Sequence, residues 1–178
     1  MKKLATVATL AILTASSVSA EGFYVGAGIS QERFGQPCGD VCKSTNAIAL
    51  IGYDINDMIS VEAETSLPVS KHNITASEIT ADVSVYHTAV FAKLTLPTSG
   101  SFKPFARAGM MKGTFEAEDI GDDLYFKVSD TVFSYGIGAE WALSEKFGLR
   151  VDYSKMKISS DGQPLDTDVL ALSSVYRF

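Results

Sequence analysis

The sequence predicts an all-β protein, specifically an eight-stranded antiparallel up-and-down transmembrane β-barrel. Three observations support this fold class: apolar and polar residues alternate with a period of two, short and long connections alternate between the periodic segments, and the more uniform face of each segment is the apolar one. Beyond the N-terminal region, no apolar run approaches the roughly 20 residues that a membrane-spanning helix needs. A helical membrane protein is therefore excluded.

The N-terminal segment, residues 1–20, has the layout of a secretory signal peptide: two lysines, an apolar run and a closing Ser-Val-Ser-Ala. The apolar run is too short to span a bilayer, which makes a membrane-anchoring helix the weaker interpretation. We expect cleavage after Ala20, leaving one barrel domain over residues 21–178. Loss of the two leader lysines changes the net charge from −6 to −8, and such an acidic chain is not expected to bind nucleic acid.

Eight segments with the period of a strand follow the leader. They lie at about residues 22–33, 46–55, 59–68, 82–96, 104–116, 129–142, 147–158 and 167–178. The connections "NDM", "PTSGSFK" and "SEK" are short, whereas those at 34–45, 69–81, 117–128 and 159–166 are longer and polar. Transmembrane barrels show this alternation because their periplasmic turns are tight and their external loops are larger.

The two faces of each strand predict which side meets lipid. In "FSYGIGAEW", one face carries Phe133, Tyr135, Ile137, Ala139 and Trp141, and the other carries Ser134, Gly136, Gly138 and Glu140. "FGLRVDYS" and "GFYVGAGIS" divide in the same way, while "AIALIGYD" is apolar on both faces and does not discriminate. A barrel in lipid is apolar outside and tolerates polar groups inside, so the mixed face is assigned to the interior.

Charged residues on the inward faces are balanced in sign. We predict an interior ion-pair network formed by Glu62, Glu64, Glu140 and Asp152 with Lys93, Arg107, Arg150 and Arg177. An unpaired charge in a narrow lumen is costly, so these side chains are expected to pair. Eight strands enclose an interior that side chains can fill, which favours a plugged barrel.

Aromatic residues gather near the short turns and predict a girdle at one membrane interface. They are Phe23, Tyr53, Trp141, Phe147, Tyr176 and Phe178. In this arrangement the last strand closes against the first, and no strand edge is left in lipid.

The stretches "GFYVGAGIS", "FSYGIGAEWALSEKFGLRVDYS" and the terminal "VYRF" resemble the small OmpA/OmpX-type outer-membrane β-barrels of Gram-negative bacteria. The resemblance implies an outer-membrane location, contact with outer-membrane lipids and lipopolysaccharide, and a structural or adhesive role. It also implies that Tyr176 and Phe178 form the signal read by the barrel-assembly machinery. Host or envelope surface molecules are the candidate ligands of the external loops. No cofactor is expected, nor the cell-wall-binding domain of longer OmpA-type proteins.

Two other functions are alternatives: a small pore and, less favoured, an enzyme that modifies lipid A. Such an enzyme needs a histidine near a nucleophile or carboxylate. His72 falls in a predicted loop and reads as a solvated residue. His87 falls on a strand, where Asp82 and Ser84 have the opposite parity and so face away from it. His87 is therefore expected to lie in the interior or at the membrane interface.

Two cysteines, Cys38 and Cys42, stand four residues apart in the turn-rich segment "QPCGDVCKS". Export to an oxidising compartment permits a local disulfide between them. A metal site is the rival interpretation, but two thiols without a nearby second pair of ligands make a poor one.

The third long connection is acidic and includes Glu116, Glu118, Asp119, Asp122 and Asp123. These carboxylates are candidates for holding a divalent cation that bridges lipopolysaccharide phosphates. The segment lacks the alternating ligands and the closing glutamate of a calcium loop. A solvated loop tip is therefore the favoured interpretation.

Overall fold

The described part of the chain consists of antiparallel strands closed into a barrel. The computed structural model describes residues 22–34, 43–69, 72–76, 79–119, 125–160 and 163–178. Within these ranges, no helix is long and apolar enough to cross a membrane. The strands are β1 (Phe23–Phe34), β2 (Lys43–Asp54), β3 (Ile59–Pro68), β4 (His72–Ala76), β5 (Ile79–Thr95), β6 (Phe102–Asp119), β7 (Tyr125–Ala142), β8 (Phe147–Ser160) and β9 (Gln163–Arg177).

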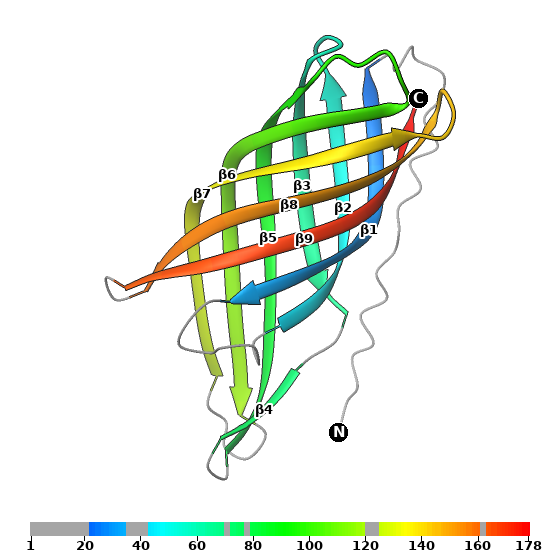
Figure 1. Ribbon diagram of the computed structural model, residues 1–178. Helices are drawn as coiled ribbons and strands as arrows, with labels where there is room; N and C mark the ends of the chain where they lie inside the picture. The colour runs from blue at the N-terminus through cyan, green and yellow to red at the C-terminus, as the bar shows by residue number, and fades with distance from the viewer. Residues whose placement is uncertain (1–21, 35–42, 70–71, 77–78, 120–124, 161–162) are drawn as a thin grey trace.

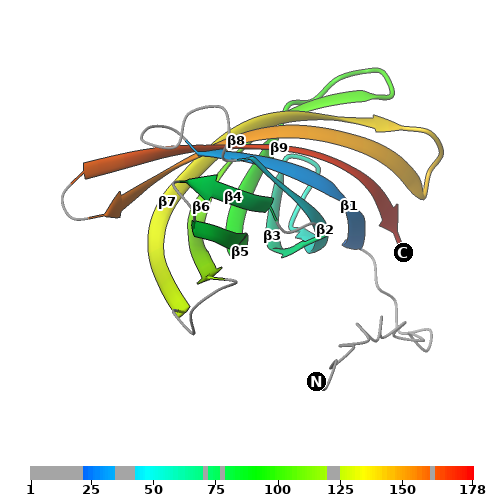
Figure 2. The same cartoon turned by 90° about the horizontal axis from the view of Figure 1, so that it is seen from below.

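Two pairings between strands that are not consecutive in the chain close the barrel. The first and last strands pair along their length, from Tyr24 opposite Arg177 to Phe34 opposite Thr167. On the other side of the barrel, β3 pairs with β5. The strands consequently wrap around a common axis, as the two views in Figures 1 and 2 show.

The nine labelled strands form eight staves. Residues 59–65 of β3 pair with the end of β5 that leads into a short turn, and β4 pairs with residues 79–83 at the opposite end of β5. The other edge of β5 is occupied by β6, so β3 and β4 lie along the same edge and act as two parts of one stave. The predicted eight-stranded antiparallel up-and-down barrel is confirmed.

An apolar belt surrounds the barrel because exposed and buried residues alternate along the strands. The outward residues are apolar from the short turns toward the opposite end of the barrel, with the exception of Ser174. Its hydroxyl group donates a hydrogen bond to the Ala27 carbonyl oxygen at 3.2 Å. Between Trp141 and Phe133 on β7, the belt extends about 20 Å along the barrel axis. This height follows from a rise of about 3.4 Å per residue along a strand tilted by about 40°. The belt ends at a first outward polar residue on each stave: Gln31, Thr45, Thr65, Thr88, Lys112, Thr131, Lys155 and Asp168.

The face assignments made from the sequence agree with the burial pattern. On β2, where the pattern did not discriminate, Ile48 and Leu50 lie inside while Ile51 and Tyr53 lie outside. Gly52 also points inward, beside the ring of Tyr24.

Tight turns close one end of the barrel, which we call the turn end; it lies at the top of Figure 1, and the opposite end is the hairpin end. Two of these turns share one geometry. Asn56 accepts hydrogen bonds from the amides of Met58 and Ile59 at 2.9 and 2.8 Å, and Ser144 accepts one from the amide of Phe147 at 3.1 Å. A side-chain acceptor at the second turn position thus satisfies backbone donors that the ladder leaves free.

The predicted aromatic girdle contains ring pairs at the turn end. The ring centroids of Phe23 and Tyr53 are 4.8 Å apart, and those of Phe147 and Tyr176 are 4.9 Å apart. Phe178 packs edge-on against Tyr176 and donates its amide hydrogen to the carbonyl oxygen of Phe23 at 3.2 Å. The chain therefore ends beside its first strand, where the terminal ring continues the outer belt.

The long connections are shorter in the structure than the sequence predicted. The strands continue into them, so that β5 begins at Ile79, β6 ends at Asp119, β7 begins at Tyr125 and β9 begins at Gln163. These extensions exist because antiparallel pairing satisfies backbone hydrogen bonds equally well outside lipid, where no alternating pattern is required.

Three site predictions fall in these extensions or beyond them. His72 lies on β4 rather than in a loop, and Glu116, Glu118 and Asp119 lie on β6 rather than at a loop tip. Their strand pairing, such as Glu116 opposite Lys127, explains the difference. Asp122, Asp123, Cys38 and Cys42 lie outside the described residues.

Candidate functional site

The interior of the barrel is charged, and it contains the residues that the sequence singled out. Seven of the eight predicted network residues are buried, whereas Arg177 at the turn end keeps 26% of its side chain exposed. Their inward direction follows from the two-residue period of the strands, because every second side chain of β3, β5, β6, β7, β8 and β9 points into the barrel.

Glu62 is the meeting point of the half nearer the turn end. Arg150 binds it with two nitrogens, at 2.6 Å to Oε1 and 2.9 Å to Oε2. Lys93 Nζ lies 3.0 Å from the same Oε1 and also donates to the hydroxyl of Tyr24 at 2.8 Å, while that hydroxyl donates to Glu62. The third guanidinium nitrogen of Arg150, Nε, reaches Asp152 at 3.2 Å.

Arg107 extends the same contacts toward the hairpin end. Its Nη2 lies 2.5 Å from Asp152 Oδ1, its Nη1 lies 2.8 Å from Glu64 Oε2, and its Nε donates to Ser154 Oγ at 3.0 Å. Glu64 Oε1 lies 3.1 Å from His87 Nε2. His87 Nδ1 in turn lies 2.9 Å from Glu32 Oε1.

These contacts form one continuous line of charges that alternate in sign, which we call the charge chain. Its members, in order of contact, are Lys93, Glu62, Arg150, Asp152, Arg107, Glu64, His87 and Glu32. They come from β1, β3, β5, β6 and β8, so the chain ties the walls of the barrel together across its interior. Every ion in it has an oppositely charged partner, as burial of charges requires.

A separate ion-pair group lies at the rim of the turn end. Arg177 Nη1 contacts Glu140 Oε1 at 2.5 Å, and Arg177 Nε lies 3.7 Å from Asp54 Oδ2. Glu140 stands directly opposite Arg150 in the strand register, yet the partner of Arg150 is Glu62. The two groups therefore divide the eight predicted residues into six in the charge chain and two at the rim.

Glu32 and His87 are members that sequence reasoning did not include in the network. The signal for Glu32 was its even position on β1, which it shares with inward Tyr24 and Ser30. For His87 it was its odd position on β5, shared with Lys93. Both ring nitrogens of His87 contact carboxylate oxygens, so hydrogen bonding at both requires two N–H donors and hence the imidazolium form. Glu32 adds one negative charge and the His87 imidazolium adds one positive charge, so the charge chain contains equal numbers of anions and cations.

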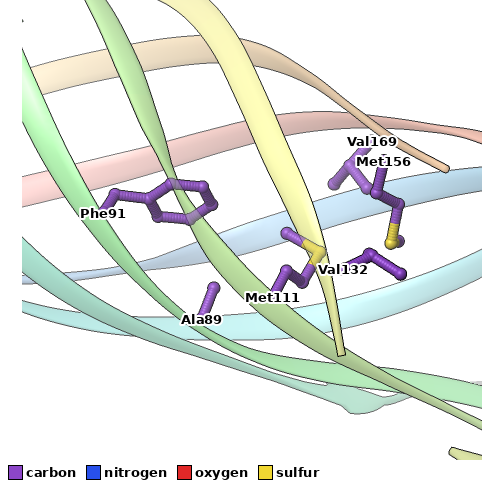
Figure 3. Close-up of a cluster of buried hydrophobic side chains, with 6 residues drawn as sticks. All are labelled: Ala89, Phe91, Met111, Val132, Met156 and Val169. Atoms are coloured by element: carbon purple, nitrogen blue, oxygen red, sulfur yellow. The ribbon is translucent and has the colours of Figure 1, made fainter. Parts of the chain in front are cut away.

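Aromatic and apolar side chains enclose the charge chain. The guanidinium carbons of Arg107 and Arg150 lie 4.3 Å and 4.4 Å from the ring centroids of Phe91 and Phe105, at the separation of cation–π contacts. Phe91 also belongs to a cluster of buried apolar side chains, which Figure 3 shows. It consists of Ala89, Phe91, Met111, Val132, Met156 and Val169. Charged, aromatic and apolar side chains thus lie together in the interior of the barrel.

Ser66, His87 and Glu64 have the connectivity of a hydrolase triad. Ser66 Oγ lies 2.9 Å from His87 Nδ1, and Glu64 contacts the other ring nitrogen. However, Ser66 is fully buried inside the barrel, and Glu32 competes with it for the same nitrogen at 2.9 Å. A nucleophile needs access to its substrate, so this arrangement fits a structural hydrogen-bond cluster better than a catalytic one.

Several buried polar side chains of the interior lie on β1 and β9. Buried oxygens of Ser30, Glu32, Thr167 and Ser173 have no hydrogen-bond partner in the protein among the described residues, and such sites are where buried water is expected. Within the described part of the chain, no group of three or more His, Cys, Asp or Glu side chains could hold a metal ion.

A closed barrel with an apolar outer belt, an aromatic rim and a paired polar interior defines a transmembrane β-barrel. Comparison with protein families gives the same class. Residues 4–178 match the outer membrane protein beta-barrel domain. The chain belongs to this family.

Solved structures of similar fold share low sequence identity with this chain. Neisserial surface protein A has a TM-score of 0.69 and 19% identity, covering 88% of this chain and 97% of that one. Ail, the attachment invasion locus protein of Yersinia pestis, has a TM-score of 0.62 and 16% identity, covering 88% and 99%. The outer membrane enzyme PagL has a TM-score of 0.51 and 16% identity, covering 87% and 99%. No curated protein sequence matches the chain significantly.

Proposed function

We propose that this protein is a plugged barrel of the outer membrane of a Gram-negative bacterium, with a structural or adhesive role exerted from its hairpin end. The observation that carries the proposal is the charge chain, because its eight ions pair across the lumen and occupy the space that a permeation path would need. Residues 1–20 direct export and are removed, and the hairpin end faces outward.

The hairpin end offers the surface for interaction. The hairpins β4–β5, β6–β7 and β8–β9 continue beyond the apolar belt, so a barrel fixed in lipid holds them out from the membrane. Ail, whose fold is similar, is named for attachment and invasion and has been solved in complex with the heparin analogue sucrose octasulfate. Host or envelope surface molecules are accordingly the proposed ligands.

A role without catalysis is part of the proposal. PagL demonstrates that a similar fold supports an enzyme, and the contact of Ser66 with His87 makes the question specific for this chain. Burial of both residues supports the non-enzymatic role. A Ser66→Ala variant should therefore leave lipid A unchanged relative to the unmutated protein, as measured by mass spectrometry of lipid A from cells expressing each form.

The test of the proposal is a deletion strain complemented with altered barrels. One variant replaces residues 72–83 with a two-residue turn, and the control replaces the turn residues 98–100 with an unrelated turn of equal length. Attachment to host cells, survival in serum and sensitivity to detergent are measured in parallel. Loss of attachment or serum survival in the first variant alone supports an adhesive role for the hairpin end.

The other outcomes are equally informative. Detergent sensitivity in the deletion strain, restored by both variants, supports a purely structural role. If the deletion strain matches its parent in all three measurements, both roles are overturned.

A further inference from the structure

We propose that the outer face of β3, β5 and β6 binds one lipopolysaccharide molecule, with an acyl chain in a shallow apolar groove and a phosphate on Lys112. The inference rests on the proposed outer-membrane placement and goes beyond it by naming a site. Four observations support it: a row of polar side chains, the apolar groove beside this row, the absence of a described ion-pair partner for Lys112, and the position of the row at the edge of the apolar belt.

Four polar side chains form a row across neighbouring strands. Thr65 pairs with Thr88, Thr88 with Lys112, and Lys112 with Thr131. Residues directly opposite in an antiparallel ladder have Cβ atoms about 5 Å apart, so Thr88 and Thr131 flank Lys112 on the outer surface. Thr65 lies one strand further along the row. This combination presents hydrogen-bond donors and a positive charge to a phosphate.

A groove runs from this row into the apolar belt. Its outward lining consists of Ala49, Ile51, Ala63, Val90 and Met110, and the end of the groove nearer the hairpin end is formed by Thr65, Thr88, Lys112 and Thr131. The hollow arises because the alanines of β2 and β3 are shorter than their isoleucine, valine and methionine neighbours. A hydrocarbon chain is complementary to such a surface.

Lys112 differs from the other lysine at the edge of the belt. Lys155 lies 3.5 Å from Asp168, which also accepts a hydrogen bond from Tyr153 at 2.7 Å. Lys112 forms no ion pair with any side chain that the structure describes. Its charge is available to an external anion, whereas the charge of Lys155 is already compensated within the protein.

The position of the row selects the lipid. It lies at the outer end of the apolar belt, at the depth where headgroups of the outer leaflet begin. Lipopolysaccharide carries its phosphates on a sugar to which acyl chains are attached directly. A single molecule can therefore place a phosphate on Lys112 and a chain in the groove.

The experiment measures lipid retained by the purified mature protein. The protein is incorporated into phosphatidylcholine nanodiscs that contain a small equal fraction of rough lipopolysaccharide, its dephosphorylated form or phosphatidylglycerol. After detergent extraction, bound lipid is quantified by mass spectrometry. The unmutated protein should retain phosphorylated lipopolysaccharide in preference to the other two lipids.

Two matched variants locate the site. Lys112→Met keeps the apolar stem and removes the charge, and it should lower retention of lipopolysaccharide about fivefold, the effect of one lysine near an anionic lipid surface. Lys155→Met removes a compensated charge and should leave retention unchanged. Lys112→Arg should bind as the unmutated protein does.

Three results would overturn the proposal: equal losses in Lys112→Met and Lys155→Met, no loss in either, or equal retention of phosphatidylglycerol by the unmutated protein. Heat-dependent migration on gels verifies that each variant is folded. Should Lys112→Met fail to fold, comparison of phosphorylated with dephosphorylated lipopolysaccharide on the unmutated protein still decides. A folded barrel that retains no lipid would reject the site and leave the proposed function standing.

Discussion

Arg150 uses every nitrogen of its guanidinium group within the charge chain. All three of its guanidinium nitrogens contact carboxylates, two on Glu62 and one on Asp152. The side chain is completely buried. In such surroundings the loss of one ion leaves its partners with unbalanced charge, which costs more than the loss of a surface pair.

We expect Arg150→Met to lower the free energy of unfolding by about 3 to 5 kcal/mol, with a similar loss for Glu62→Gln. The double variant should lose less than the sum, because each single change leaves the other ion without its main partner. Urea unfolding in detergent micelles measures all four forms. The control is Lys155→Met, which removes the exposed ion pair with Asp168 and should leave the free energy of unfolding nearly unchanged. Additive, small effects at Arg150 and Glu62 would contradict the coupling.

At this scale the sequence predicted which side chains face inward but not which of them pair. The period of two placed Glu62, Lys93 and Arg150 inside. Pairing depends on the stagger of strands around the barrel and on side-chain reach: Arg150 contacts Glu62, 88 residues away, rather than its opposite neighbour Glu140. The local pattern contains no information on such a distance across the lumen.

Among the elements, β2 shows how a small residue makes room for the interior contacts. A Cβ atom on Gly52 would lie 2.1 Å from Cζ of Tyr24. Tyr24 is fully buried and joins Lys93 to Glu62 through its hydroxyl. The glycine therefore sets the position of the tyrosine ring.

Gly52→Ala is expected to displace this ring and to lower the free energy of unfolding by about 1 to 3 kcal/mol, the usual cost of overpacking. Gly100→Ala is the matched control, since nothing lies within 4 Å of a Cβ atom at that turn position, and it should change stability by less than about 0.5 kcal/mol. Both are measured by urea unfolding. Equal stability of the two variants would show that Tyr24 has an alternative position.

The lengths of the strands were underestimated for a physical reason. Inside the belt, lipid on one side and charges on the other impose the alternation that the sequence displays. Beyond it, β6 and β7 continue to pair, with Phe115 opposite Val128 and Glu116 opposite Lys127. The acidic residues of this segment favoured a loop, because the sequence alone does not show that they stand opposite a partner strand.

For the whole molecule, the belt and the closed seam predict the behaviour of a folded transmembrane barrel. The mature protein should fold in detergent micelles and migrate differently on gels before and after heating, because closure resists denaturation by the gel detergent. In a planar bilayer it should show no steady conductance, since in the proposed function the charge chain and the apolar cluster block the lumen. Solubility as a monomer without detergent would refute the barrel, and a steady single-channel current would refute the plug.

Assembly in cells tests the proposed recognition of the C-terminal strand. Deletion of Phe178 removes one rim contact with Tyr176 and, in the proposal, part of the signal read by the barrel-assembly machinery. Assembly in cells should therefore fall more than refolding in micelles, with both measured as the heat-modifiable fraction. Equal losses in the two assays would restrict Phe178 to its packing role.

The overall architecture was predictable because a barrel in lipid has few solutions. Backbone groups must be satisfied without water, and a sheet with apolar residues outside must close on itself. The pairing of the last strand with the first follows from these constraints and is present in the structure.

That last strand has a distinctive inner face. β9 contributes no residue to the charge chain; its inward side chains between the rim and the hairpin end are Thr167, Val169, Ala171, Ser173 and Val175, and its ionic contacts to the barrel interior are those of Arg177 at the rim. Separation of β9 from β1 therefore breaks backbone hydrogen bonds but leaves all eight ions of the chain paired. Under a mechanical load applied at the C-terminus, we expect β9 to detach in a first step. The remaining strands, which the charge chain still joins, should separate only in a later step.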